Sequence, residues 1–176
     1  VGAPTLPTLL TDKEVEQWRK QAPARTPHPV NLDGAMVRNA CEYDKATDGA
    51  ETVQMLGHSM NAVALPKNGE LTYNFTTDRE GPSVLRVAVI PTQPNDGGDL
   101  RFSVSVDGDE PTVYTLKEPF RSEQWKLNVL RGQALREMKL NLNRGNHTLK
   151  IKALDSHIVV DQWMIDRNPN RKFYLF

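Results

Sequence analysis

The sequence predicts an all-β fold, an antiparallel β-sandwich preceded by a proline-rich leader. From about residue 36 onward, apolar and polar residues alternate over many short runs, which is typical of antiparallel strands with one buried face. Turn segments rich in glycine and aspartate separate these runs, and no long helical pattern lies between them. Short strands at this spacing favour two packed sheets. We therefore expect a leader over residues 1–35 and a β-sandwich over residues 36–176.

The leader contains one short predicted helix. Thr11 and Glu14 form a capping box, in which each side chain can bond the other residue's backbone amide. Val15 and Trp18 lie three residues apart, so they share one face of this helix and can dock on a neighbouring surface. The helix is expected to end shortly before Pro23, because the residue before a proline is driven out of helical geometry.

The alternating runs give the expected strands and their buried faces. Every second side chain of a strand points to the same side. The expected core residues, run by run, are Leu71, Tyr73 and Phe75; Leu85, Val87 and Val89; Phe102, Val104 and Val106; Met138, Leu140 and Leu142; and Leu149, Ile151 and Ala153. In the last run, the alternation places one set on one face and a second set on the other: Val159, Asp161, Trp163 and Ile165 against Ile158, Val160 and Met164. Residues 106–111 and 144–146 are predicted to be hairpin connections.

Composition excludes several classes of protein. The chain has 22 Lys and Arg against 22 Asp and Glu, and this balance argues against binding to nucleic acid or to an acidic membrane surface. Cys41 is the sole cysteine, which rules out an internal disulfide and a metal site built from several cysteines. Two N-x-T tripeptides, at residues 74–76 and 146–148, lie inside expected strands, so they are given no weight as glycosylation acceptors.

The candidate catalytic groups form no complete motif. Ser59 follows Gly57 and His58 but lacks the second glycine of a nucleophile elbow, so this segment is interpreted as a loop leading into a strand over residues 61–65. Cys41 is interpreted as a small buried apolar side chain. The many carboxylates lie mostly in expected turns, so a catalytic pair of acids is not favoured.

Two kinds of binding site are nevertheless conceivable from the residues. A sugar ring stacks on a flat aromatic side chain, and Tyr114 and Trp125 lie outside the clearest core alternation. They are the candidate carbohydrate-binding residues. Carboxylates also gather near the first and last expected strands, and a structural calcium joining the two chain ends would take oxygen ligands from both. The candidate ligands for that calcium are Glu42 and Asp161.

Several strand-and-turn phrases occur in an order and spacing that resemble a known family. They are G-N-H-T-L-K-I at 145–151, A-L-D at 153–155, I-V-V-D-Q-W-M-I-D at 158–166 and Y-L-F at 174–176, with L-R-F-S-V-S-V-D-G-D-E-P at 100–111 and Trp125 followed by Asn128-Val129 upstream. Together these phrases resemble the C-terminal β-sandwich domain of glycoside hydrolase family 115. The resemblance covers about residues 36–176 and is best from residue 99 onward.

The resemblance implies a fold, a context and a set of partners. Members of that family are large α-glucuronidases that remove (4-O-methyl)glucuronic acid from xylan, and their C-terminal domain is a galactose-binding-like jelly roll, as in many carbohydrate-binding modules. It therefore implies a non-catalytic accessory module, a xylan-type polysaccharide and an upstream catalytic domain as partners, and a periplasmic or extracellular location. No catalytic residue carries over. Two alternatives stay open, a self-contained small glycan-active enzyme and a protein-interaction sandwich without a glycan role.

Overall fold

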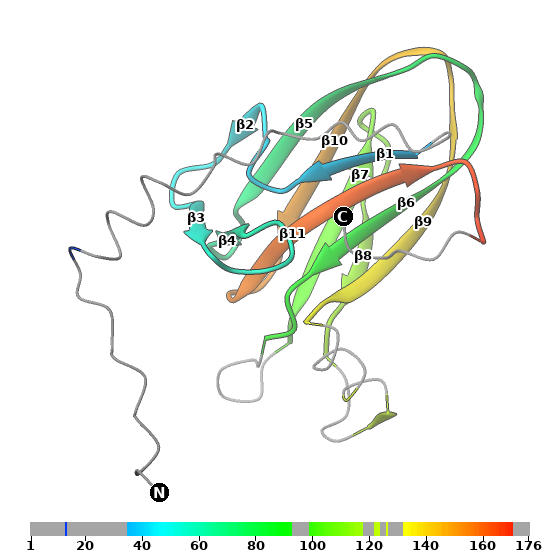
Figure 1. Cartoon of the computed structure of the whole chain (residues 1–176). Coiled ribbons are helices and arrows are strands. Elements are labelled where there is room, and N and C mark those ends of the chain that lie inside the picture. Colours follow the sequence, from blue (N-terminus) through cyan, green and yellow to red (C-terminus); the bar gives the residue numbers. More distant parts are fainter. Residues whose placement is uncertain are drawn as a thin grey trace, which may run out of the picture.

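The computed structural model consists of two antiparallel sheets packed face to face (Figure 1). It describes residues 35–92, 99–117 and 132–170, together with positions 13, 122, 123 and 126. Within these ranges the elements are strands, as the alternation predicted, and no helix is long and apolar enough to cross a membrane. The predicted leader helix falls outside the described residues apart from Lys13.

One sheet has six strands and the other has five. The first has the order β3 (Glu51–Gln54), β4 (Asn61–Leu65), β11 (Ile158–Asp166), β6 (Gly81–Val89) and β9 (Ala134–Leu142), and β1 (Ala35–Asn39) also pairs with β11. The second has the order β2 (Lys45–Ala46), β5 (Glu70–Thr77), β10 (Gly145–Ala153), β7 (Arg101–Val106) and β8 (Thr112–Thr115). In the first sheet, β11 therefore pairs with three strands, and β1 lies next to its C-terminal half.

The core lies between the two sheets, and the sequence alternation predicted most of it. The expected apolar faces of β5, β6, β7 and β10 are buried in one continuous cluster. Trp163 of β11 lies at its centre, with the Tyr73 ring edge-on at 5.4 Å and the Phe75 ring tilted at 5.7 Å between centroids. These aromatic contacts connect the two sheets, because β5 and β11 belong to different layers.

The strict alternation predicted for the last strand was wrong. The pairing of β11 with β6 shifts register between Val160 and Gln162, as a β-bulge does. The extra residue in the bulge changes which side chains share a face. The core cluster consequently takes Ile158 and Val160 together with Trp163 and Ile165, whereas Met164 packs with Ala35 and Val37 in a small second cluster.

The two predicted hairpins have different outcomes. Residues 106–111 do connect the paired strands β7 and β8, and Asp107 and Gly108 both have positive φ, at 54° and 75°, as a type I′ turn requires. Residues 144–146 do not form a hairpin, because β9 ends in the first sheet and β10 begins in the second. This connection crosses between the layers, and Gly145 takes a φ of 124° there, which favours glycine.

Candidate functional site

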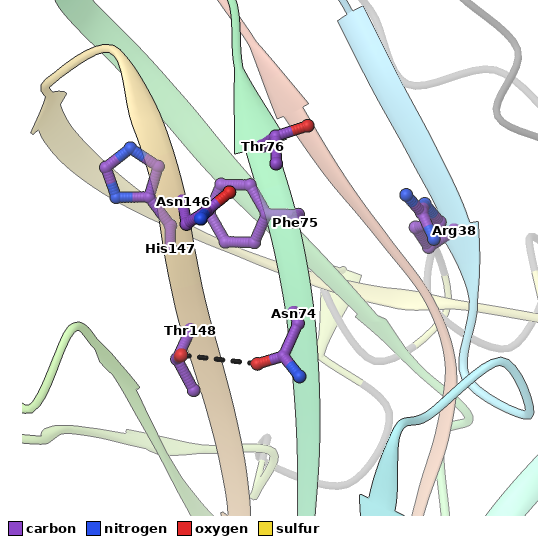
Figure 2. Close-up of a pocket in the computed structure, with 7 residues that line it drawn as sticks. All are labelled: Arg38, Asn74, Phe75, Thr76, Asn146, His147 and Thr148. Carbon is purple, nitrogen blue, oxygen red and sulfur yellow. Dashed lines mark hydrogen bonds between the residues drawn. The ribbon is translucent and has the colours of Figure 1, made fainter.

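A pocket of about 480 Å³ opens beside β5, at the side of the sandwich where the short strand β2 no longer covers it. Its lining residues come from three strands (Figure 2): Arg38 of β1; Asn74, Phe75 and Thr76 of β5; and Asn146, His147 and Thr148 of β10. β2 pairs with β5 at Leu71 and Thr72, so this pairing ends before the pocket begins. The pocket therefore brings together residues from both sheets.

One wall of the pocket is built from two identical sequence patterns. Both N-x-T tripeptides lie here, on the neighbouring antiparallel strands β5 and β10 (Figure 2). The register places Asn74 opposite Thr148 and Thr76 opposite Asn146, so each asparagine faces the other strand's threonine. The Thr148 hydroxyl donates to the Asn74 Oδ1 at 3.3 Å. Because alternate residues of a strand share a face, all four side chains lie on the same side of the sheet.

The residues between these asparagines and threonines, Phe75 and His147, point to the core side of the same sheet. Phe75 and His147 are both buried, and their rings stack at 5.3 Å between centroids with an interplanar angle of 27°. Phe75 also contacts Trp163 across the core. Phe75 thereby connects the strand that carries Asn74 and Thr76 to the main core cluster.

His147 is fixed by two acceptors. Its Nδ1 lies 2.6 Å from the Asp107 Oδ2, and its Nε2 lies 2.7 Å from the carbonyl oxygen of Asn143. Since both partners are acceptors, the doubly protonated imidazolium satisfies both contacts. Burial alone would lower the pKa of His147, but the hydrogen bonds to Asp107 and Asn143 outweigh it and raise that pKa. For Asp107, burial opposes ionisation, yet hydrogen bonds from His147 and from the Thr148 amide lower its pKa.

Arg38 supplies the charge on the opposite side of the pocket (Figure 2). It pairs with Trp163 in the β1–β11 register, so the two side chains point to the same side of the sheet. Arg38 is half-buried, and its Nε is shielded from solvent without a hydrogen-bond partner. Within the part of the chain that the structure describes, no carboxylate forms an ion pair with Arg38.

The predicted calcium ligands lie near the end of β1, in a different part of the first sheet. Asp161 is fully buried and accepts four hydrogen bonds: from the amides of His58 and Ser59, the Ser59 hydroxyl and the Gln133 side-chain amide, at 2.6–3.0 Å. Glu42 accepts from the Asn39 amide through Oε2, while its Oε1 is buried without a partner. The described residues contain no cluster of three or more His, Cys, Asp or Glu side chains placed to hold a metal.

Of the two predicted sugar-stacking residues, Tyr114 is not among the residues that line the pocket. Tyr114 is half-buried in β8, its ring stacks on Phe102 at 5.6 Å, and its hydroxyl donates to the carbonyl oxygen of Glu137. The hydroxyl contact attaches β8 to β9 of the other sheet, whereas the ring packs on β7 of the same sheet. Trp125 lies outside the described residues. The Ser59 segment is a loop before β4, as predicted, and the Ser59 hydroxyl is bonded to Asp161.

Comparison with known proteins identifies the family. The model for the glycosyl hydrolase family 115 C-terminal domain matches residues 37–176. This chain is a member of that family. The GH115 C-terminal domain also resembles the solved structure of BtGH115A, a family GH115 4-O-methyl-α-glucuronidase with specificity for decorated arabinogalactans, at 35% identity and a TM-score of 0.71. The match covers 82% of this chain and 19% of BtGH115A. No curated protein matches the chain.

Other solved structures show where this GH115 C-terminal domain stands among β-sandwiches. The C-terminal CBM6 of LamC, a laminarinase from Zobellia galactanivorans, aligns over 76% of this chain and 99% of its own, at 12% identity and a TM-score of 0.56. A family 35 carbohydrate binding module from Clostridium thermocellum aligns over 74% and 97%, at 18% identity and a TM-score of 0.56. At these identities the likeness concerns the fold, and it confirms the predicted jelly-roll sandwich.

The sequence contained a signal for the pocket of this GH115 C-terminal domain. Two N-x-T tripeptides in two strands are a repeated pattern, but only the register of β5 against β10 brings them side by side. Arg38 carried no signal of its own, because its place depends on the pairing of β1 with β11 across almost the whole domain.

Proposed function

We propose that this domain is a non-catalytic accessory module that binds polysaccharide in the pocket between β1, β5 and β10. The observation that carries the proposal is the wall of paired asparagine and threonine side chains. Amides and hydroxyls both donate and accept hydrogen bonds, so they match the hydroxyl groups of a sugar ring. The pocket volume of about 480 Å³ lies in the range of small-molecule binding sites.

The affinity expected for such a site is modest. Asn74, Thr76 and Asn146 are exposed, so water competes for each hydrogen bond that they offer to a ligand. We expect a Kd between about 1 μM and 1 mM, which corresponds to about −8 to −4 kcal/mol. Weak binding of this kind suits a module that keeps an enzyme near an insoluble chain, because a linked second site raises the effective concentration of the first.

The wider context of the proposal comes from the family. The domain spans 19% of BtGH115A, so the catalytic work of such a protein belongs to its other parts. A xylan-type polysaccharide is the partner that the sequence resemblance implies, whereas BtGH115A has specificity for decorated arabinogalactans. Both polymers therefore belong in the test. Export to the periplasm or the cell exterior follows from the same proposal, because these polymers lie outside the cell.

Calorimetric titration of this chain with oligosaccharides of xylan and arabinogalactan tests the function. Asn146→Ala and Thr76→Ala are expected to weaken binding at least about fivefold, which equals about 1 kcal/mol, the net value of one hydrogen bond. Asn141→Ala is the matched control, because Asn141 is an exposed asparagine on β9, away from the pocket. A folded protein that binds no glycan would overturn the proposal and favour a module that packs on a neighbouring domain.

The aromatic residues predicted from the sequence give a competing location for the same function. Tyr114→Ala and Trp125→Ala are therefore titrated beside the pocket variants. Loss of binding in these two variants, with unchanged binding in Asn146→Ala, would show that the sugar site lies outside the pocket. Since Tyr114 packs on Phe102, Tyr114→Phe separates loss of the hydroxyl from loss of the stacking ring.

A further inference from the structure

We infer that the pocket prefers sugars that carry an anionic group, and that Arg38 is the residue that recognises this group. The inference rests on the proposed function and names the class of ligand for the same site. It is carried by the presence, in the same pocket as the asparagine and threonine side chains, of a guanidinium that no described residue pairs.

The other buried or structural arginines show what is unusual about Arg38. The buried guanidinium of Arg86 bonds both Glu137 and Asp166, at 3.0 and 3.2 Å. Arg101 forms a forked pair with Asp155 at 2.9 and 3.2 Å. Arg38 is half-buried too, yet its guanidinium has no hydrogen-bond or ion-pair partner among the residues that the structure describes. Partly burying an unpaired charge costs free energy, and an anionic ligand would recover that cost.

Two carboxylates near the pocket accept hydrogen bonds from other groups. Among the described residues, the pocket lining contains no Asp or Glu. Asp44 accepts a hydrogen bond from the backbone amide of Asn74 at 2.6 Å. Asp107 accepts hydrogen bonds from the His147 ring and from the backbone amide of Thr148. Arg38 is therefore the charged side chain that the lining presents to a ligand, apart from His147, whose charge is paired with Asp107. No described carboxylate forms an ion pair with Arg38, so its guanidinium is available to an anionic group of a ligand.

The chemistry of Arg38 suits a planar or trigonal anion on a sugar ring. A guanidinium donates two parallel hydrogen bonds to a carboxylate, and it binds sulfate in a similar way. Arg38 belongs to β1 of one sheet, whereas the asparagines and threonines belong to β5 and β10 of the other (Figure 2). One bound sugar would therefore present its anionic group to the first sheet and its hydroxyls to the second.

The experiment compares three ligands on the intact chain by calorimetry. They are a neutral xylo-oligosaccharide, the same backbone carrying a glucuronic acid side group, and a sulfated galactan oligosaccharide. We expect the wild-type chain to bind at least one anionic ligand about tenfold more tightly than the neutral one, with the preference reduced in high salt. Arg38→Gln is expected to lose this preference. Arg79→Gln, at an exposed arginine outside the pocket, is the control.

The outcomes separate this inference from the proposed function. Equal binding of neutral and anionic ligands would overturn the inference and leave the function intact, whereas no binding of any ligand would overturn both. An anion preference that survives in Arg38→Gln would overturn the role of Arg38. Whichever of the two anionic ligands binds with the lower Kd shows whether the pocket prefers a uronate or a sulfate group. Thermal melting of each variant verifies that a loss of binding does not reflect unfolding.

Discussion

Two charged groups of the same sheet are treated in opposite ways by the fold. Asp161 of β11 is fully buried and accepts hydrogen bonds from the β3–β4 loop and from Gln133. Arg38, on the strand next to it, is half-buried and has no side-chain partner among the described residues. We call the first region the Asp161 clamp, meaning Asp161 with His58, Ser59 and Gln133, and the second the Arg38 pocket, meaning the seven lining residues described above.

The two regions show how the partners of a charged side chain decide whether it stabilises the fold or is available to a ligand. A buried charge with all its partners supplied by the protein stabilises the fold and leaves nothing for a ligand. A charge with its partners missing contributes little to stability and is available for recognition. The comparison therefore predicts large stability effects and no binding effect in the clamp, and the reverse in the pocket.

Removing the carboxylate of the clamp is the strongest test. Asp161→Ala leaves four donors without an acceptor in a buried place, and we expect it to lower the free energy of unfolding by about 3–5 kcal/mol. Urea denaturation measures the loss. Asp155→Ala is the comparison, since it removes an ion pair with a partly exposed arginine and one bond from the Arg101 backbone amide, and it should cost less than Asp161→Ala. An equal loss of unfolding free energy in the two variants would contradict the special role of the Asp161 clamp in stability.

Gly57 tests the same clamp from the loop side. A Cβ at this position would lie 2.5 Å from the Asp161 Oδ1, and the φ of +75° is itself unfavourable for other residues. Because four hydrogen bonds hold the carboxylate in place, Gly57→Ala is expected to cost about 2–3 kcal/mol. Gly108→Ala has the same φ but open space around its Cβ, so it should cost only the backbone strain. A smaller loss at Gly57 than at Gly108 would contradict the picture of a rigid clamp.

A calcium titration tests whether Glu42 and Asp161 bind a metal ion. The sequence predicted Glu42 and Asp161 as ligands, and the Glu42 Oε1 is a buried oxygen without a protein partner. Calcium binding there predicts a stabilisation of about 1 kcal/mol at a concentration several times Kd, reversed by a chelator and absent in Glu42→Gln. Thermal melting with and without calcium measures it. An identical melting temperature in both conditions would count against this metal site.

The pair of His147 and Asp107 couples the pocket wall to pH. The raised pKa of His147 means that its contribution to stability is complete below its ordinary value of 6.5 and is lost as pH rises through the raised one. The lowered pKa of Asp107 means that its contribution is present above 3.8 and is lost as pH falls through the lowered one. The pair is therefore most stabilising between about pH 4 and 6.5, by about 0.5–1 kcal/mol because Asp107 is partly exposed. His147→Gln should lower the unfolding free energy within this range. It should also flatten the decline of that free energy above about pH 6.5 and below about pH 4, which unfolding titrations across pH measure.

Arg38 gives the smallest expected effect on stability. Since no described residue bonds its guanidinium, Arg38→Gln should change the free energy of unfolding by less than about 0.5 kcal/mol in the absence of ligand. Urea denaturation, as for Asp161→Ala, measures this change in the free energy of unfolding. A loss of 2 kcal/mol or more, estimated as the cost of breaking a buried charged interaction, would show that Arg38 is a structural group after all.

Sequence patterns predicted the fold well because alternation is a local signal. The faces of β5, β7 and β10 follow directly from the period of two, and the Asp107-Gly108 turn follows from residues that tolerate positive φ. The bulge in β11 could not be read from the sequence, because every side chain around it is compatible with either face until β6 fixes the register. The prediction of a hairpin at residues 144–146 failed for a related reason. A short connection that contains glycine can join two strands of one sheet or two strands of different sheets.

The candidate site was harder to predict because its residues meet only through long-range pairing. Asn74 and Asn146 stand in the same tripeptide pattern, and a strand alternation alone gave no reason to set them side by side. Arg38 reaches the pocket because β1 pairs with the C-terminal half of β11. Tyr114 was predicted to bind sugar because it is an aromatic residue outside the regular core pattern. In the structure, its ring packs on Phe102 and its hydroxyl donates to the Glu137 carbonyl oxygen.

The pairing of β1 with β11 also has a consequence for how the molecule assembles. It joins two segments that stand at opposite ends of the described sandwich, so its formation closes the longest loop in the fold and carries the largest entropic cost. Strands β4 and β6 can dock on β11 without β1, and β1 is then the strand added to an existing edge. During synthesis, the arginine side of the pocket is therefore completed only after β11 has left the ribosome, and hydrogen exchange should find β1 among the first strands to open.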